Sequence, residues 1–110
     1  MRHPLHIILA ALMLAAAVGC SRSVDRCLVL ADTLMWKNPD SSLAILTAIN
    51  HDSLTTDEDR AYHALLLTQA RFRVDYYDYP SDSLINTALD YYSDNHNREH
   101  YTRALLYKGA

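Results

Sequence analysis

The sequence predicts an all-α protein whose antiparallel helix pairs stack as a solenoid. Its two glycines are Gly19 and Gly109, so a β-hairpin turn between them would have no glycine available. Residues 60–77 are apolar on more than one face of a helix, which predicts that this helix lies between others. The pattern Ala-Leu-Leu-x-x-x-Ala occurs at residues 64–70 and again at 104–110. Helix pairs that repeat in this way bury their apolar faces by stacking on one another.

The first 19 residues have the composition of a signal peptide. A short basic start at residues 1–4 precedes the apolar run Leu5–Val18, which His6 alone interrupts. The run has 14 residues, which is short for a membrane span and typical of a signal-peptide core. An uncleaved signal anchor and a buried helix are the alternatives.

The apolar run leads into Ala17-Val18-Gly19-Cys20. Small residues followed by Cys resemble the lipobox of bacterial lipoproteins, in which the Cys becomes the acylated N-terminus of the mature chain. The resemblance implies lipidation of Cys20, for example with palmitate, and a lipid-anchored location in a bacterial cell envelope, on the periplasmic or outer-membrane side. Two or more acyl chains, at about 0.8 kcal/mol per buried methylene, would anchor the protein stably. We therefore divide the chain into a signal peptide (1–19), the lipidated Cys with its tether (20–23) and helical repeats (24–110).

The charge of the chain argues against one class of function, and its cysteine content argues against an internal disulfide. Without residues 1–19 the chain has nine Arg and Lys against thirteen Asp and Glu, which argues against nucleic-acid binding by this segment. Cys27 is then the one thiol besides Cys20, so no internal disulfide is expected. Cys27 lies on an apolar stripe, and we interpret it as a small core residue.

Two helices are predicted before residue 50. Apolar residues recur at three- and four-residue spacing from Val24 to Met35, and this first helix should end near Trp36. Pro39 disfavours helical geometry in the preceding residue and ends the helix. Residues 40–42 then offer capping side chains for a short second helix, whose apolar row is Leu43, Leu46 and Ile49.

The third helix is predicted to begin with a capping box, in which Thr55 is the N-cap and Glu58 follows three residues later. It should continue to a tyrosine-rich segment at 76–79. Aromatic residues there could anchor a partner or fill the junctions between helix pairs.

Two further helices complete the pattern. Capping residues at 81–83 introduce a fourth helix, and a polar break at 93–97 separates it from a fifth that opens near Arg98. No stop signal precedes Ala110, so we interpret the chain as the N-terminal portion of a longer protein. The fourth helix carries the apolar residues Leu84, Ile85, Ala88, Leu89 and Tyr92.

Two motifs repeat at nearly one period. The Ala-Leu-Leu motif returns after 40 residues, and Pro-x-x-Ser-Leu at 39–43 returns at 80–84. The sequence resembles the tetratricopeptide repeat (TPR), whose pattern is W-x2-L-G-x2-Y, then A-x3-F, then P. Leu65 and Leu105 would occupy its large apolar position. Phe72 would occupy the aromatic position and Gly109 the glycine position, and Ala88-x3-Tyr92 fits the A-x3-F of the second helix. The sequence departs from the pattern at Thr68-Gln69 and Lys108, fits A-x3-F less well at Ala44-x3-Ala48, and has extra length over residues 73–82.

The resemblance implies a concave groove, lined by the first helix of each pair, that holds extended peptides. Arg73 and Arg103 could there pair with carboxylates of a peptide, or could simply be solvated. The residues that would face the groove are His63, Leu66, Ala70, Arg73, Arg103 and Leu106.

Residues 96–100 match H-x-x-E-H, the zinc pattern of inverted zincins. A zinc site needs both histidines on one helix face together with a third ligand. His96 lies in the polar break and His100 in the fifth helix, so we interpret this segment as a helix start with two exposed histidines.

The sequence thus predicts a membrane-anchored, non-enzymatic scaffold that binds a protein or peptide and uses no cofactor or metal. One alternative is the sensor input domain of a longer signalling or transcription-regulating protein. A remote alternative is a zinc-dependent hydrolase that uses His96 and His100.

Overall fold

The computed structural model describes residues 23–75 and 82–109, which form five α-helices and one short 3-10 helix without any strand. The all-α prediction is therefore confirmed. The predicted signal peptide, Cys20 and most of the tether lie outside the described residues, as do Tyr76, Tyr77 and Tyr79. The elements are α2 (Val24–Leu34), α3 (Pro39–Ala48), η1 (His51–Ser53), α4 (Asp57–Val74), α5 (Asp82–Tyr92) and α6 (Arg98–Gly109). None of the described helices is long and apolar enough to cross a membrane.

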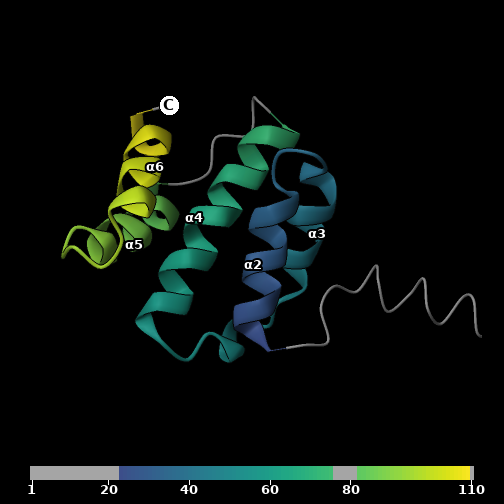
Figure 1. Cartoon of the computed structure of the whole chain (residues 1–110), viewed down its shortest axis with the longest axis horizontal. Coiled ribbons are helices and arrows are strands. Elements are labelled where there is room, and N and C mark those ends of the chain that lie inside the picture. The colour runs from purple at the N-terminus through teal and green to yellow at the C-terminus, as the bar shows by residue number, and fades with distance from the viewer. Residues whose placement is uncertain (1–22, 76–81, 110) are drawn as a thin grey trace, which may run out of the picture.

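Helix α4 lies at the centre of the molecule, with α2 and α3 on one side and α5 and α6 on the other (Figure 1). It packs against all four of these helices. Seven consecutive residues, Ala64–Ala70, are all buried, because neighbours cover nearly the whole circumference of the helix there. The prediction that this helix lies between others is confirmed.

Each side of α4 contributes to a separate hydrophobic cluster. Leu66, Leu67 and Ala70 pack with residues of α2 and α3, whereas Ala64 and Leu65 pack with residues of α5 and α6. Neighbouring residues of α4, such as Leu65 and Leu66, pack in different clusters because a helix turns by about 100° per residue. The α4 side chains thus join two sequential helix pairs into one compact body.

The two Ala-Leu-Leu segments differ in their surroundings. Ala64 and Ala104 are both buried in the cluster formed with α5. Leu65 and Leu66 are fully buried, but their counterparts on α6 are exposed, Leu105 by 47% and Leu106 by 67%. The described helices therefore show sequentially packed pairs, and their stacking as a solenoid remains a prediction.

Two predicted helix starts were wrong by one or more residues. The Asn38 side chain caps α3 by accepting from the Ser41 amide at 3.2 Å, so Asn38 and Pro39 begin this helix. Pro suits the first helical position because its missing N–H would have no partner there. In α4 the cap is Thr56 instead of Thr55, and Thr56 Oγ1 accepts from the Asp59 amide at 3.0 Å.

The connection between α5 and α6 explains how the chain turns without glycine. Asn95 has a φ of 66°, in the left-handed region that Asn tolerates better than most residues. Its amide donates to the Tyr92 carbonyl, which closes the end of α5. Asn97 then caps α6 by accepting from the His100 amide at 3.0 Å. The polar break predicted at residues 93–97 is confirmed.

Candidate functional site

An open groove of about 760 Å³ lies between the segment after α2, Gln69 of α4 and one face of α6. Much of its lining is apolar and exposed: Trp36 and Leu106 are each 67% exposed, and Leu105 is 47% exposed. Exposed apolar side chains gathered in one groove are typical of a binding surface. The lining residues are Trp36, Gln69, Glu99, Thr102, Arg103, Leu105, Leu106 and Tyr107.

Arg73 holds Trp36 at the edge of this groove. Its guanidinium carbon lies 4.3 Å from the centroid of the indole ring, a cation–π arrangement. Its Nε donates to the Met35 carbonyl at 3.0 Å. Arg73 of α4 therefore fixes the segment that follows α2 and presents the indole to solvent.

A polar cluster beside the groove links α2, α4 and α6. The Tyr62 hydroxyl donates to Asp32 Oδ2 at 2.5 Å, and Arg103 Nη1 donates to Asp32 Oδ1 at 3.0 Å. Arg103 also donates from Nε and Nη2 to Glu99 Oε1, at 3.2 and 2.8 Å. Asp32 and Glu99 together carry one more charge than Arg103 balances, so the cluster has a net negative charge.

The protonation states of this cluster are set by burial and by its own charges. Burial raises the pKa of Tyr62 above its usual range, and the hydrogen bond to Asp32 raises it further. Burial alone would lower the pKa of Arg103, but its hydrogen bonds to Glu99 and the charge of Asp32 raise the pKa overall. Near neutral pH the phenol is therefore uncharged and the guanidinium is charged.

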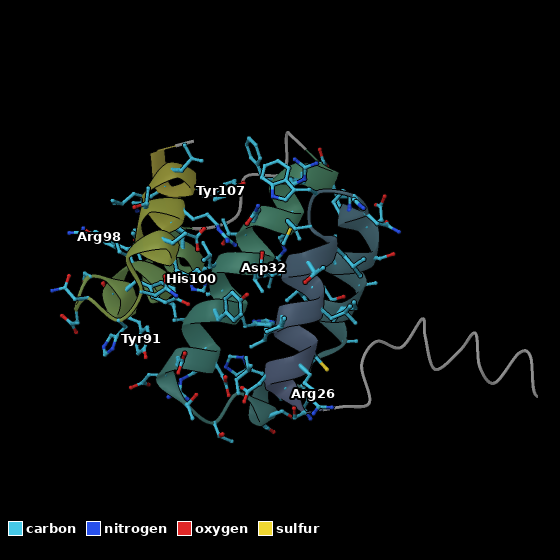
Figure 2. The ribbon with its side chains drawn as sticks, in the orientation of Figure 1. Arg26, Asp32, Tyr91, Arg98, His100 and Tyr107 are labelled. Atoms are coloured by element: carbon cyan, nitrogen blue, oxygen red, sulfur yellow. The ribbon has the colours of Figure 1, made fainter. Side chains whose placement is uncertain are left out.

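His100 lies in an aromatic pocket between α4 and α5. Its ring stacks on Tyr62 with centroids 4.7 Å apart, and its Nδ1 is 3.1 Å from the Tyr92 hydroxyl. Burial, aided by the charge of Arg103, lowers the pKa of His100. Figure 2 labels Asp32 on α2 and His100 on α6, and the Tyr62 side chain of α4 contacts both. The prediction that His100 is exposed was wrong, because the two tyrosines enclose its ring.

Gln69 forms the buried base of the groove. Gln69 is 2% exposed, yet its side-chain Oε1 has no hydrogen-bond partner among the described residues. The amide of this side chain hydrogen bonds to the Tyr107 hydroxyl, which moderates the rise that burial causes in the pKa of Tyr107. An acceptor that is buried without a partner is rare in native proteins and calls for an explanation.

The residues expected to line a peptide groove fall into two groups. Arg103 and Leu106 line the groove described here. Leu66 and Ala70 are fully buried against α2 and α3, and a side chain with no exposed surface does not contact a ligand in this arrangement. His63 lies 2.9 Å from the Leu46 carbonyl through Nε2, on the side of α4 that faces α3.

The H-x-x-E-H segment does not form a metal site in the described part of the chain. His96 precedes α6 and stacks on Tyr91 with centroids 4.1 Å apart, whereas His100 stacks on Tyr62. The expectation that His96 lies in the break before the fifth helix, outside that helix, is confirmed. Residues 23–75 and 82–109 contain no group of three or more His, Cys, Asp or Glu side chains arranged to hold a metal ion.

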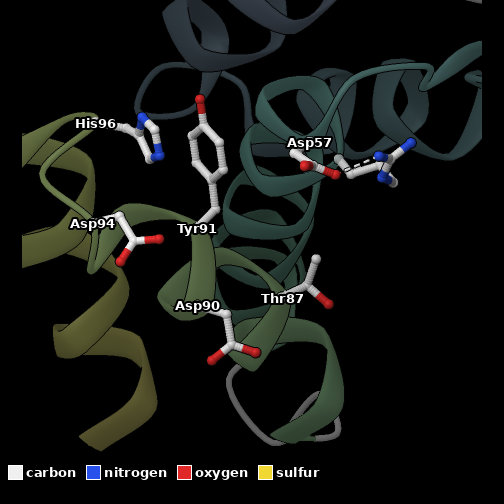
Figure 3. Close-up of a pocket in the computed structure, with 7 residues that line it drawn as sticks. Asp57, Thr87, Asp90, Tyr91, Asp94 and His96 are labelled. Carbon is white, nitrogen blue, oxygen red and sulfur yellow. Dashed lines mark hydrogen bonds and ion pairs between the residues drawn. The ribbon is translucent and has the colours of Figure 1, made fainter.

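A second, smaller pocket of about 500 Å³ lies near the start of α4 and the end of α5 (Figure 3). Asp57, Asp90 and Asp94 contribute carboxylates to its lining, and the His96 ring lies beside that of Tyr91. Arg60 pairs with Asp57 at 2.5 Å. These side chains are mostly exposed. Asp57 lies in the first turn of α4, where a negative charge interacts favourably with the helix dipole, whereas Asp90 and Asp94 at the end of α5 are exposed to solvent.

Comparison of the chain with protein-family models, with curated proteins and with solved structures finds no match. The likeness to the TPR pattern therefore stays a resemblance in the residues quoted above.

Sequence reasoning missed six residues of the groove: Trp36, Gln69, Glu99, Thr102, Leu105 and Tyr107. The sequence places Trp36 at the end of a helix, and the enrichment of Trp at the energetic centres of interfaces was the signal that could have marked it. Gln69 follows the apolar run Ala64–Leu67 and Thr68, and a polar residue within a helix that is apolar on several faces is itself a signal. Tyr107 offers no comparable signal.

Proposed function

We propose that this protein is a membrane-anchored helical-repeat scaffold that binds a protein or peptide partner on the extracytoplasmic side of a bacterial envelope, without catalysis. The observation that carries the proposal is the groove beside α4 and α6, where Trp36, Leu105 and Leu106 are exposed around a buried polar side chain. Binding surfaces combine apolar contact area with a few polar groups that fix the orientation of the ligand.

The packing of the described helices supports this proposal. Helices α2, α4 and α6 are joined by the Asp32–Arg103 ion pair and the Tyr62–Asp32 hydrogen bond, so the walls of the groove hold a fixed geometry. A rigid groove binds with less loss of conformational entropy than a flexible one. Trp and Arg, which recur at the energetic centres of interfaces, both occur at this surface.

The binding proposal can be tested by selection from a random peptide-display library against the full chain in detergent micelles. We expect enrichment of a sequence family whose members bind in fluorescence polarisation and lose binding to Leu106→Asp. The matched control is Val29→Asp, because Val29 is 58% exposed and lies outside the groove on α2. Absence of enrichment, or equal loss in both variants, would refute the groove as a peptide site.

The anchoring proposal rests on residues 5–20 of the sequence. Metabolic labelling with an alkyne-bearing palmitate should label the wild-type protein in the membrane fraction, and Cys20→Ser should be unlabelled and soluble. Cys27→Ala is the matched control, because Cys27 is the other thiol and is buried in the core of the protein. Labelling that persists in Cys20→Ser would disprove lipidation at this residue.

A further inference from the structure

One face of α2 is exposed along its whole length, and we call it the outer face. The Asn38 amide donates to the Leu34 carbonyl at 2.8 Å, so the last helical turn continues beyond the end of α2. Exposed residues recur here at three- and four-residue steps, which places them on one side of the helix. The outer face consists of Arg26, Val29, Leu30, Thr33 and Lys37. It thus combines two adjacent apolar side chains, 58% and 41% exposed, with a basic residue towards each end.

The polar groups of the outer face suit contact with a lipid surface. Thr33 Oγ1 donates to the Val29 carbonyl at 2.8 Å, so this hydroxyl has its partner within the helix. A polar group that is already hydrogen bonded costs less to remove from water. Arg26 and Lys37 have long aliphatic stems, which let their charged ends stay among phosphate groups while Val29 and Leu30 lie deeper.

Charge is distributed unequally along the chain. Residues 20–39 contain three Arg or Lys against two Asp, whereas residues 40–110 contain six Arg or Lys against eleven Asp or Glu. Of the two Asp in the first segment, Asp32 is paired internally in the polar cluster described above. The other, Asp25, borders the outer face next to Asp59 of α4. An anionic surface therefore attracts the α2 segment and repels the remainder of the protein.

The predicted lipid lies close to the outer face. Cys20 precedes Val24, the first residue of α2, by four positions. A chain spans at most about 3.6 Å per residue, so the start of α2 is within about 14 Å of a lipid attached to Cys20. The membrane that holds this lipid is thus within reach of Arg26 and Val29.

On the basis of the proposed lipid anchor, which belongs to the proposed function, we propose that the outer face of α2 lies on an anionic phospholipid surface. Arg26 and Lys37 contact phosphate groups of the lipids. Val29 and Leu30 enter the boundary between headgroups and acyl chains, as the apolar face of an interfacial helix does. This contact fixes the orientation of the protein on the membrane, which a short tether alone does not.

The test uses the full lipidated protein, reconstituted into vesicles of phosphatidylcholine alone or of phosphatidylcholine with phosphatidylglycerol. Thr33→Cys introduces a thiol on the outer face for an environment-sensitive fluorophore. Thr87→Cys on α5 is the matched control, because both threonines are exposed and each hydroxyl donates to the carbonyl four residues earlier. Cys20 is acylated in the lipidated protein and Cys27 is buried, so the introduced thiol is the one that reacts.

We expect the emission of the label in Thr33→Cys to shift to shorter wavelength in vesicles that contain phosphatidylglycerol. Lipids that carry a nitroxide on an acyl chain should quench it there. The label in Thr87→Cys should keep the emission that it has in detergent in both kinds of vesicle. High salt should reduce the shift in Thr33→Cys, because salt screens exposed charges.

Charge reversal tests the two basic residues of the outer face. In the labelled protein, Arg26→Glu combined with Lys37→Glu should lower the ratio of docked to undocked molecules by roughly tenfold, a difference of about 1.4 kcal/mol. The matched control is Arg98→Glu combined with Lys108→Glu on α6, on the other side of α4 from α2 (Figure 2). It changes the net charge by the same amount at two exposed residues and should leave the emission in Thr33→Cys unchanged.

The possible outcomes separate this inference from the anchor on which it rests. Protein that floats with both kinds of vesicle in a density gradient, while the label in Thr33→Cys stays in water, overturns the inference and leaves the anchor standing. An equal shift in neutral vesicles, or an undiminished shift after reversal of Arg26 and Lys37, also overturns the inference alone. Protein that floats with neither kind of vesicle overturns both. A shift that appears in detergent and grows with protein concentration assigns the outer face to a second copy of the chain and overturns the inference.

Discussion

The two sides of α4 are built differently. Towards α2 and α3 the core consists of large aliphatic side chains such as Leu28, Met35 and Leu46. Towards α5 and α6 it consists mainly of alanines, with Tyr92 as the largest buried residue. Alanines allow close approach of helices but bury little apolar area each. The first side therefore supplies most of the hydrophobic stabilisation, and the second side supplies polar contacts that shape the groove.

The largest difference in stability between the two sides of α4 is expected when the equivalent leucines of the two Ala-Leu-Leu motifs are truncated. Leu66 packs in the hydrophobic cluster formed with α2 and α3 and has no solvent-exposed surface. Leu66→Ala should therefore reduce the free energy of unfolding by about 2–5 kcal/mol. Leu106→Ala, at the corresponding position of α6, should change it by less than about 0.5 kcal/mol. Urea denaturation followed by circular dichroism measures both. Similar losses in the two variants would show that the motif copies have equivalent surroundings.

A larger side chain at an alanine tests the close packing on the second side. Ala104 is fully buried against α5 and α4, so Ala104→Leu should destabilise the protein by about 1–3 kcal/mol through overpacking. Ala44→Leu on the exposed face of α3 is the matched control and should be nearly neutral. If Ala104→Leu were equally neutral in urea denaturation, the second side would contain unfilled space.

Two ion pairs allow the polar contacts to be compared. Arg103 and Asp32 are 20% and 24% exposed, and a double-mutant cycle with Arg103→Met and Asp32→Asn should give a coupling of about 1–2 kcal/mol. Arg60 and Asp57 are 39% and 80% exposed, and their coupling should stay below about 1 kcal/mol. A reversed order would mean that the inter-helix pair contributes less than a local surface pair.

The smallest effect is expected from pH. Burial lowers the folded-state pKa of His100 below its ordinary value of 6.5, so between these two pKa values the unfolded chain binds more protons than the folded one. Stability should therefore fall as the pH falls from about 6.5 towards the lower folded-state pKa of His100. His100→Gln should reduce this slope in urea titrations at each pH. An unchanged slope in His100→Gln would contradict a buried, neutral imidazole.

Apolar periodicity made the helices and the central position of α4 predictable from sequence, because burial on several faces requires several neighbours. The helix caps were harder to predict. Asn38 and Thr56 each have an alternative polar residue within two positions, and local sequence does not decide between them. The lining of the groove was least predictable, since the exposure of Leu106 and the unpaired state of Gln69 depend on how α6 lies against α4.

The contact between Arg103 and Asp32 joins residues 71 positions apart in the chain. Closing so long a loop is entropically expensive, so such a contact tends to form late, after the local helix pairs have assembled. Interactions absent from the folding transition state act mainly on the rate of unfolding. Arg103 should therefore govern how long a folded molecule persists, while leaving the speed at which new molecules fold almost untouched.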